Sequence, residues 1–291
     1  MSVRNNEERF GAKKVNSDPP PQVETQATEG DAEGTPSAPL SFSTPTEYVD
    51  LPSKGEFYPP GHPLHKQDSL EIRYMTARDE DILTSKSLLK KGVAIDRFLQ
   101  NIIVNRNVAV ESLLVGDKNA LIVAARVTGY GTEYKTKMPC PSCGANVTNE
   151  FNLENATVKE ATLEEGVERT PKGTFVLKTP RGGTTVEIKL LTGADERRLS
   201  KLVEVKRKKN LPESTLSDQL RLAIVSVNGI GEPNMLNMFM GSLPAYDARY
   251  MRDIYANLMP NVDMRQDFEC PSCGYEQEME VPFTSDFFWP K

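Results

Sequence analysis

All four cysteines of the chain lie in two copies of one motif, Cys-Pro-Ser-Cys-Gly. The first copy holds Cys140 and Cys143, and the second holds Cys270 and Cys273. Two thiolates separated by two residues can occupy adjacent corners of a metal's tetrahedron, and the glycine that follows permits a tight turn. Two such knuckles supply four sulfurs, the usual ligand set of a closed structural zinc site. The sequence therefore predicts one structural zinc ion, bound by both motifs in a zinc-ribbon-like site of four cysteines.

Other uses of the four thiols stay open at this point. They are a redox dithiol, a disulfide, an iron–sulfur cluster, and a zinc ion shared by two chains that each give one knuckle. A disulfide is disfavoured because the cytoplasm is reducing. A redox dithiol is disfavoured because the two identical pairs lack a thioredoxin-like sequence context. Catalytic zinc is disfavoured because four thiolates leave no open position. We therefore expect Cys140→Ser to unfold or aggregate the protein rather than to abolish a turnover.

The elements that must position the two knuckles recur along the chain. The segment Glu71–Leu83 aligns with Glu187–Leu199, with six of thirteen positions identical. Further on, Asp117 and Asp247 each lie 23 positions before the first cysteine of a knuckle. Because these matches occur in the same order, we expect an internal duplication in which each half contributes two of the four thiolates.

Each half is expected to hold a β element, about three helices and a small β knuckle, so the fold class is α+β and helix-rich. Thr76 with Asp79, and Thr192 with Asp195, form Thr-x-x-Asp caps that start a helix in each half. Amphipathic spacing and stop signals predict six helices: 77–91, 95–103, 117–127, 194–209, 216–227 and 244–258.

Composition divides the chain into three parts. Residues 1–46 are predicted to be a disordered, Pro-rich acidic tail, because they hold too few large apolar residues to offset the entropy of ordering. Residues 47–160 form the first predicted repeat with its knuckle, and 161–291 form the second. We expect the repeats to pack as one unit, with zinc as the clamp.

Charge and composition exclude several functional classes. The net charge is −6, which disfavours a general nucleic-acid binder. The sequence has no apolar run of roughly 20 residues for a membrane helix and no signal-peptide core at its start, so we expect a cytoplasmic location. The two histidines, His62 and His65, are expected in an exposed loop, and the acidic residues at the helix starts are expected to be caps. No catalytic residue is predicted, and the protein is not expected to be an enzyme.

Two further clusters have more than one interpretation. The run 206–209, Lys-Arg-Lys-Lys, could touch nucleic acid, but it also falls in the last turn of a predicted helix, where cations complement the dipole. The aromatic residues Phe287, Phe288 and Trp289 either fill the domain's own core or dock on a partner.

Several short motifs occur together in one order, beginning with Leu51–Gly55 and Phe57–Pro59 and continuing with Met75–Glu80, Gly129–Tyr134 and the first cysteine motif. In combination they resemble the T-even-type bacteriophage baseplate protein family, over roughly Tyr48 to Lys291. The resemblance implies a non-enzymatic contractile-tail protein that acts in assembling the central baseplate hub, as a chaperone or as a hub subunit. It implies other hub and tail proteins as partners, and the host cytoplasm or the virion tail baseplate as location.

A second hypothesis comes from a different class. Zinc ribbons also occur in nucleic-acid-binding proteins, so the alternative is a phage transcription or replication accessory protein. Salt-sensitive affinity for DNA or RNA would favour this alternative over the baseplate hypothesis.

Overall fold

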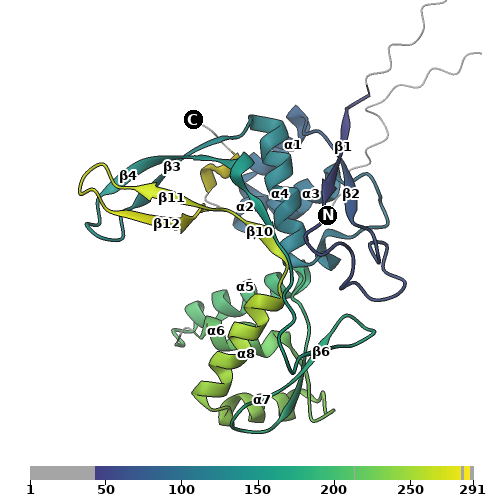
Figure 1. Cartoon of the computed structure of the whole chain (residues 1–291). Coiled ribbons are helices and arrows are strands. Elements are labelled where there is room, and N and C mark those ends of the chain that lie inside the picture. Colours follow the sequence, from purple (N-terminus) through teal and green to yellow (C-terminus); the bar gives the residue numbers. More distant parts are fainter. Residues whose placement is uncertain (1–42, 213, 283–284, 289–291) are drawn as a thin grey trace, which may run out of the picture. The chain divides into compact units, whose positions relative to one another are not determined.

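An antiparallel strand pair opens the part of the chain that the computed structural model describes, which comprises residues 43–212, 214–282 and 285–288 (Figure 1). Strand β1 (Thr46–Asp50) pairs with β2 (Ser69–Arg73). Leu70 and Ile72 alternate with half-buried polar residues along β2 and point into the core. The predicted disordered tail, residues 1–46, falls outside the described residues except for its last four, and Thr46 already belongs to β1.

Four helices follow the strand pair: α1 (Ala77–Thr84), α2 (Lys86–Lys90), α3 (Ala94–Ile102) and α4 (Val115–Tyr130). The predictions for α3 and α4 are confirmed within a few residues. The prediction of one continuous helix over 77–91 is wrong, because Ser85 takes an extended conformation with φ −63° and ψ 107°. The Thr84 hydroxyl donates back to the carbonyl of Glu80, and serine favours helix ends, which accounts for the break.

Helix α4 is the central element of the first half, since its buried residues lie around most of its circumference. It shares one hydrophobic core with α3, whose side chains Phe98, Leu99 and Ile102 are fully buried, and its Lys118 pairs with Asp96 of α3 at 2.9 Å. Near its start, Gly116 leaves no room for a side chain: an added Cβ would lie 1.9 Å from the carbonyl oxygen of Pro260. Glycine at this position is what lets the segment before β10 (Asn261–Asp263) approach the helix.

The second half begins with an antiparallel sheet in the order β6-β7-β8-β9. Its strands are β6 (Glu168–Arg169), β7 (Phe175–Lys178), β8 (Thr185–Ile188) and β9 (Ile224–Val227). Between β8 and β9 the chain forms α5 (Gly193–Lys208) and α6 (Thr215–Ala223). The prediction of a helix over 216–227 is wrong in its last four residues, because these form β9 and pair with β8.

The rest of the second half is helical before it returns to strands. Helix α7 (Pro233–Ser242) has no predicted counterpart, whereas α8 (Ala245–Leu258) confirms the helix predicted over 244–258. Strand β5 (Thr157–Lys159) pairs with β10, which joins the end of the first half to the segment after α8. Short 3₁₀ turns occupy Val110–Ser112, Leu153–Asn155 and Ser285–Phe288.

Two β hairpins carry the cysteine motifs at their turns. The first is β3 (Glu133–Pro139) with β4 (Asn146–Asn152), and the second is β11 (Arg265–Glu269) with β12 (Glu276–Glu280). They lie side by side in Figure 1. The side chain of Gln266 holds them together, because its oxygen accepts from the Asn152 backbone N–H at 3.0 Å and its amide donates to the Asn152 carbonyl at 2.9 Å.

The fold is mixed helix and antiparallel sheet, as predicted. Each half runs from strands through helices to a cysteine-bearing hairpin, but β9 lies between the helices of the second half and has no counterpart among the described strands of the first. The internal duplication stays a prediction, as does the division at residue 160. Phe287 and Phe288 fill the protein's own core, at 2% and 3% exposure, and Trp289 lies outside the described residues. Across the described part of the chain, none of the helices is both long and apolar enough to cross a membrane.

Candidate metal centre

The four cysteines meet where the turns of the two hairpins come together. Their sulfur atoms all lie within 4.8 Å of one another, although Cys143 and Cys270 are 127 positions apart in the chain. The Sγ of Cys140 lies 3.8 Å from that of Cys273, and the Sγ of Cys143 lies 3.8 Å from that of Cys270. Each of these two contacts pairs a cysteine of one knuckle with a cysteine of the other.

These distances fit a tetrahedral metal site. Four sulfurs that each lie about 2.3 Å from a zinc ion are about 3.8 Å apart along a tetrahedral edge. Among the described residues, the cluster contains cysteines alone, without a histidine or carboxylate. Four converging sulfurs can therefore bind a metal ion, and a set of four thiolates fits zinc and leaves no coordination position for a substrate.

The backbone of the two knuckles is nearly the same. The N–H of Gly144 donates to the carbonyl of Cys140 at 2.9 Å, and the N–H of Gly274 donates to that of Cys270 at 2.8 Å. Both glycines have positive φ, 72° and 67°, a conformation that side chains disfavour. The expected role of the glycine after each second cysteine is thus visible in both turns.

Burial and hydrogen bonds set the charge of the thiols before any metal binds. Backbone N–H groups of Cys143 and Ser142 donate to the sulfur of Cys140 and lower its pKa to about 7, against the opposing effect of burial. At Cys273 the N–H of Tyr275 favours the thiolate, but burial and the three neighbouring sulfurs raise its pKa to about 12. The neighbouring sulfurs thus favour the thiolate of Cys140 and oppose ionisation of Cys273, an opposition that a bound dication would reverse.

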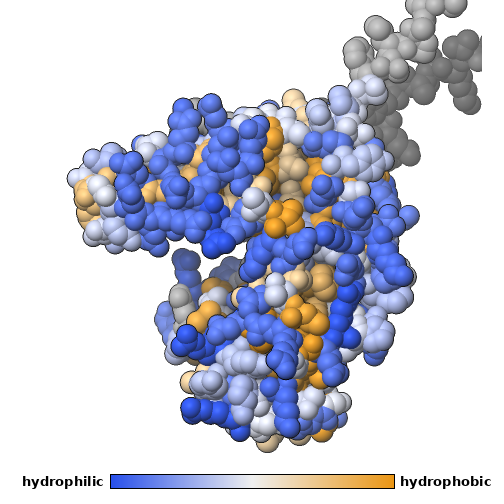
Figure 2. Space-filling view, in the orientation of Figure 1, coloured by the Kyte–Doolittle hydropathy of each residue, from blue (hydrophilic) through white to orange (hydrophobic). Residues whose placement is uncertain are grey.

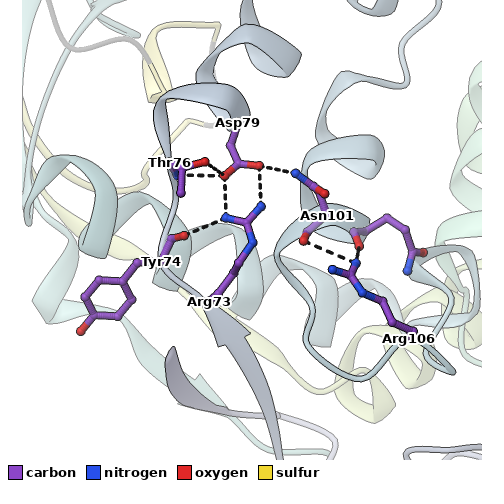
Figure 3. A network of polar contacts seen from close by, with 7 residues as sticks. Arg73, Tyr74, Thr76, Asp79, Asn101 and Arg106 are labelled. Atoms are coloured by element: carbon purple, nitrogen blue, oxygen red, sulfur yellow. Dashed lines mark hydrogen bonds and ion pairs between the residues drawn. The ribbon is translucent and has the colours of Figure 1, made fainter. Parts of the chain in front are cut away.

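The acidic residues at the helix starts have structural partners. Asp79 is fully buried and accepts two hydrogen bonds from the Arg73 guanidinium, at 2.7 and 2.9 Å. It also accepts from the N–H and hydroxyl of Thr76 and from the Asn101 amide (Figure 3). Burial alone would raise the pKa of Asp79, but these donors hold it at about 2. A carboxylate saturated with donors is a helix cap and not a general base.

The second half repeats this arrangement with one substitution. Asp195 accepts from the N–H and hydroxyl of Thr192, and Lys189 replaces the arginine, with its Nζ 2.8 and 2.9 Å from the carboxylate oxygens. The capping-box predictions at both helix starts are confirmed.

The two aspartates that precede the knuckles at equal spacing are also fully buried. Asp117 accepts from the N–H and hydroxyl of Ser53 and from the Tyr58 hydroxyl. Asp247 accepts from the N–H groups of Arg181 and Gly182, at 2.9 and 2.8 Å. Each therefore ties the start of a helix to a loop earlier in its own half.

The two histidines are less exposed than the sequence suggested. Both rings are half-buried in their loop, and the His62 ring stacks on Tyr58 with centroids 4.3 Å apart. Its Nε2 lies 2.9 Å from the Ser112 hydroxyl, while Nδ1 of His65 lies 2.7 Å from the Tyr58 carbonyl. Burial lowers the pKa of His62. Neither histidine belongs to the cysteine cluster.

Arg126 is a structural residue for which no role was predicted from the sequence. It is fully buried, and its guanidinium donates to three carbonyls, those of Phe287 at 2.6 Å, Gly131 at 2.6 Å and Glu133 at 2.9 Å. It thereby joins the end of α4 to the start of β3 and to the last described turn. Its position directly after the apolar run 120–125 was the available signal, since a cation there must find acceptors.

Residues 45–175 match the family model described as T4 bacteriophage base plate protein. The resemblance inferred from the motifs is confirmed over that range, which includes Cys140 and Cys143 but ends before the second knuckle. No curated protein and no solved structure matches the chain.

Proposed function

We propose that this chain, a T4-type baseplate protein over residues 45–175, acts in assembling the central hub of a contractile phage tail. It does so through contacts with other tail proteins, as an assembly chaperone or as a hub subunit, and without catalysis. The family match is the observation that carries this proposal. A baseplate protein works in the tail, so its partners are other tail proteins of the same phage.

In this proposal the cysteine cluster is a structural zinc site. Cys140 and Cys143 come from the segment that matches the family, and Cys270 and Cys273 come from the second half. A zinc ion bound by all four would hold the second hairpin to the family segment. The ion supplies cross-linking alone, and the surfaces that bind partners are those of the protein.

The engagement of the buried acids supports a non-enzymatic function. Two of them, Asp79 and Asp195, are saturated with donors from their own neighbourhood. Asp117 accepts three hydrogen bonds from nearby groups, and Asp247 accepts two. Four thiolates would leave no open metal position for a substrate or water.

The charge of the second ribbon argues against the nucleic-acid alternative. One face of the β11–β12 hairpin carries five exposed carboxylates and a single arginine: Arg265, Asp267, Glu269, Glu276, Glu278 and Glu280. Two acidic pairs stand directly opposite each other across the strands, Asp267 with Glu278 and Glu269 with Glu276. A ribbon with this face repels phosphates, so this ribbon is not suited to a nucleic-acid surface.

Co-expression tests the proposal. The protein would be produced together with each tail protein of its phage in turn, purified through a tag, and the mature particles would be assayed for the chain by mass spectrometry. We expect stable co-purification with a hub component; presence in particles identifies a subunit, and absence identifies a chaperone. Salt-sensitive binding to DNA together with no tail-protein complex would refute the proposal and favour the alternative.

A further inference from the structure

Helix α5 contacts the rest of the protein through its first turn and along the side that faces α6. Of its 16 residues, only Gly193 and Asp195 are buried. Farther along, Lys206 pairs with Asp218 of α6 at 2.6 Å. Most of the surface of α5 is therefore open to solvent in the described part of the chain.

This exposed helix has aliphatic residues on two of its sides. Leu199 and Val203 are half-buried on the same side as Lys206, where α6 lies, and they line a groove of about 650 Å³ with Thr215 of α6. Leu202 and Val205 point to another side and remain 41% and 47% exposed. Figure 2 shows hydrophobic residues at the surface beside hydrophilic ones, in the region where Figure 1 labels α5, α6 and α8. A helix with apolar residues on two sides is suited to two neighbours, and α6 supplies one of them.

The charge of α5 is opposite to that of the whole protein. From residue 197 to 209 the chain has seven basic residues and one acidic residue, within a protein of net charge −6. Four of these cations have carboxylate partners within the protein: Arg197, Lys206, Lys208 and Arg198, whose side chain lies 3.6 Å from Asp195 and is still 69% exposed. Among the described residues, Lys201 and Lys209 have none.

Five of these residues form one exposed line along the helix, which we name the outer stripe: Arg198, Lys201, Leu202, Val205 and Lys209. Their spacing of i, i+3, i+4, i+7 and i+11 places them on a single face. We propose that the outer stripe binds an acidic segment of a partner protein. Carboxylates of that segment pair with the three cations, and its apolar side chains cover Leu202 and Val205.

The chemistry of the outer stripe favours an acidic protein segment over three other occupants, namely a second copy of the chain, a nucleic acid and a membrane surface. A symmetric contact between the outer stripes of two copies would set three cations against three cations, which is repulsive. A nucleic acid would find cations but no stacking partner, because residues 193–223 contain no aromatic residue. Membrane-surface helices carry Trp, Phe or Leu over a long apolar face, whereas the stripe has two aliphatic residues. An acidic protein segment matches both the charge and the aliphatic anchors.

The inference rests on the proposed function only for the statement that the partner is a tail protein. The binding test therefore uses a defined probe: a fluorescent peptide of about 20 residues with Glu and Leu at helical spacing. Its companions are the same peptide with Gln for Glu, a short DNA duplex and anionic phospholipid vesicles. We expect the full-length zinc-loaded protein to bind the acidic peptide, with affinity that falls as salt rises.

Two variants of the stripe are compared with a matched control. K201E combined with K209E reverses the charge of two cations. L202Q combined with V205Q removes the two aliphatic anchors and introduces glutamine, which is a good helix former. The control, K86E combined with K90E on α2, makes the same charge change at exposed lysines of another helix. Both stripe variants should weaken peptide binding about tenfold, and the control should match the wild type. Circular dichroism checks that all three remain folded.

Several results would overturn the inference. They are no peptide binding by the wild type, equal loss in the control, equal binding of the Gln peptide, or tighter binding of DNA or vesicles than of the acidic peptide. The same variants enter the co-expression test. Tail-protein complexes that form equally well with the wild type and the stripe variants refute this inference and leave the proposed function standing. Failure of the wild type to form any such complex refutes the proposed function, while the peptide result still decides the chemistry of the stripe.

Discussion

Removal of a metal ion from the cysteine cluster is expected to lower the thermal stability of the protein by a predictable amount. If one zinc ion joins Cys140 and Cys143 to Cys270 and Cys273, it is a cross-link between distant parts of the chain. A chelator then converts the cross-linked protein into one held only by its core and by contacts such as the Gln266–Asn152 pair. Because that core and those contacts remain, the protein should stay folded at low temperature and unfold earlier on heating, which replaces the expectation from the sequence that Cys140→Ser alone unfolds or aggregates it.

The size of this effect follows from the length of the closed loop. The inner cysteines, Cys143 and Cys270, lie 127 positions apart. Cross-linking a loop of that length lowers the chain entropy of the unfolded state by an amount worth about 5 kcal/mol at 25 °C. For a domain of this size each kcal/mol shifts the midpoint by about 2–4 °C, so the chelator should lower the melting temperature by roughly 10–20 °C.

Calorimetry with and without chelator measures the shift, and native mass spectrometry should count one zinc ion per monomer. The decisive variant removes one knuckle, C140S combined with C143S. If the ion joins the knuckles, this variant loses nearly all sensitivity to chelator. Retention of about half the shift, or two ions per chain, would show independent sites and refute the reasoning. A shift that grows with protein concentration would indicate zinc shared between two chains.

Three further predictions concern residues away from the metal. R126M should lower the free energy of unfolding by about 3–5 kcal/mol in urea titrations, because three buried carbonyls lose their donor; a loss below 1 kcal/mol would contradict this. The pKa of Asp79, lowered from 3.8 to about 2, adds stability that is complete above pH 5 and is lost as the pH falls toward 2. The stability difference between wild type and D79N should therefore shrink by about 2 kcal/mol over that range, and a difference independent of pH would rule the linkage out. G116A should cost about 3 kcal/mol because its Cβ would meet the Pro260 carbonyl, whereas G129A on the same helix, facing a flexible methionine end, should be nearly neutral.

Two kinds of feature were predictable from the sequence: contacts between residues that are close along the chain, and clusters of residues of one type that bind the same ligand. Thr76 and Asp79 are three positions apart, so the cap follows from helix geometry alone. The four cysteines could be grouped because thiolates in CxxC pairs have few partners other than a metal or one another. Their grouping across the chain was correct, since the sulfurs do meet.

The wrong or missing predictions involve choices made by distant partners. Leu216, Leu220, Ile224 and Val227 fit a helical period, but residues 224–227 are mostly β-branched and β8 offers an edge for pairing. The carbonyls that bind Arg126 come from residues 131, 133 and 287, and no local pattern identifies them. The break at Ser85 depends on small differences among hydroxyl contacts within one turn.

The long separation of the two knuckles also sets a timescale during synthesis. At about 5–20 residues per second, the ribosome takes roughly 6–25 s to add the 127 positions between Cys143 and Cys270. For that interval the first hairpin exists with only two of its four sulfurs and without the neighbouring hairpin. The nascent family segment therefore carries an open, thiol-bearing turn throughout that interval. A metal ion could bind all four sulfurs only after the second half has been made and has reached the first.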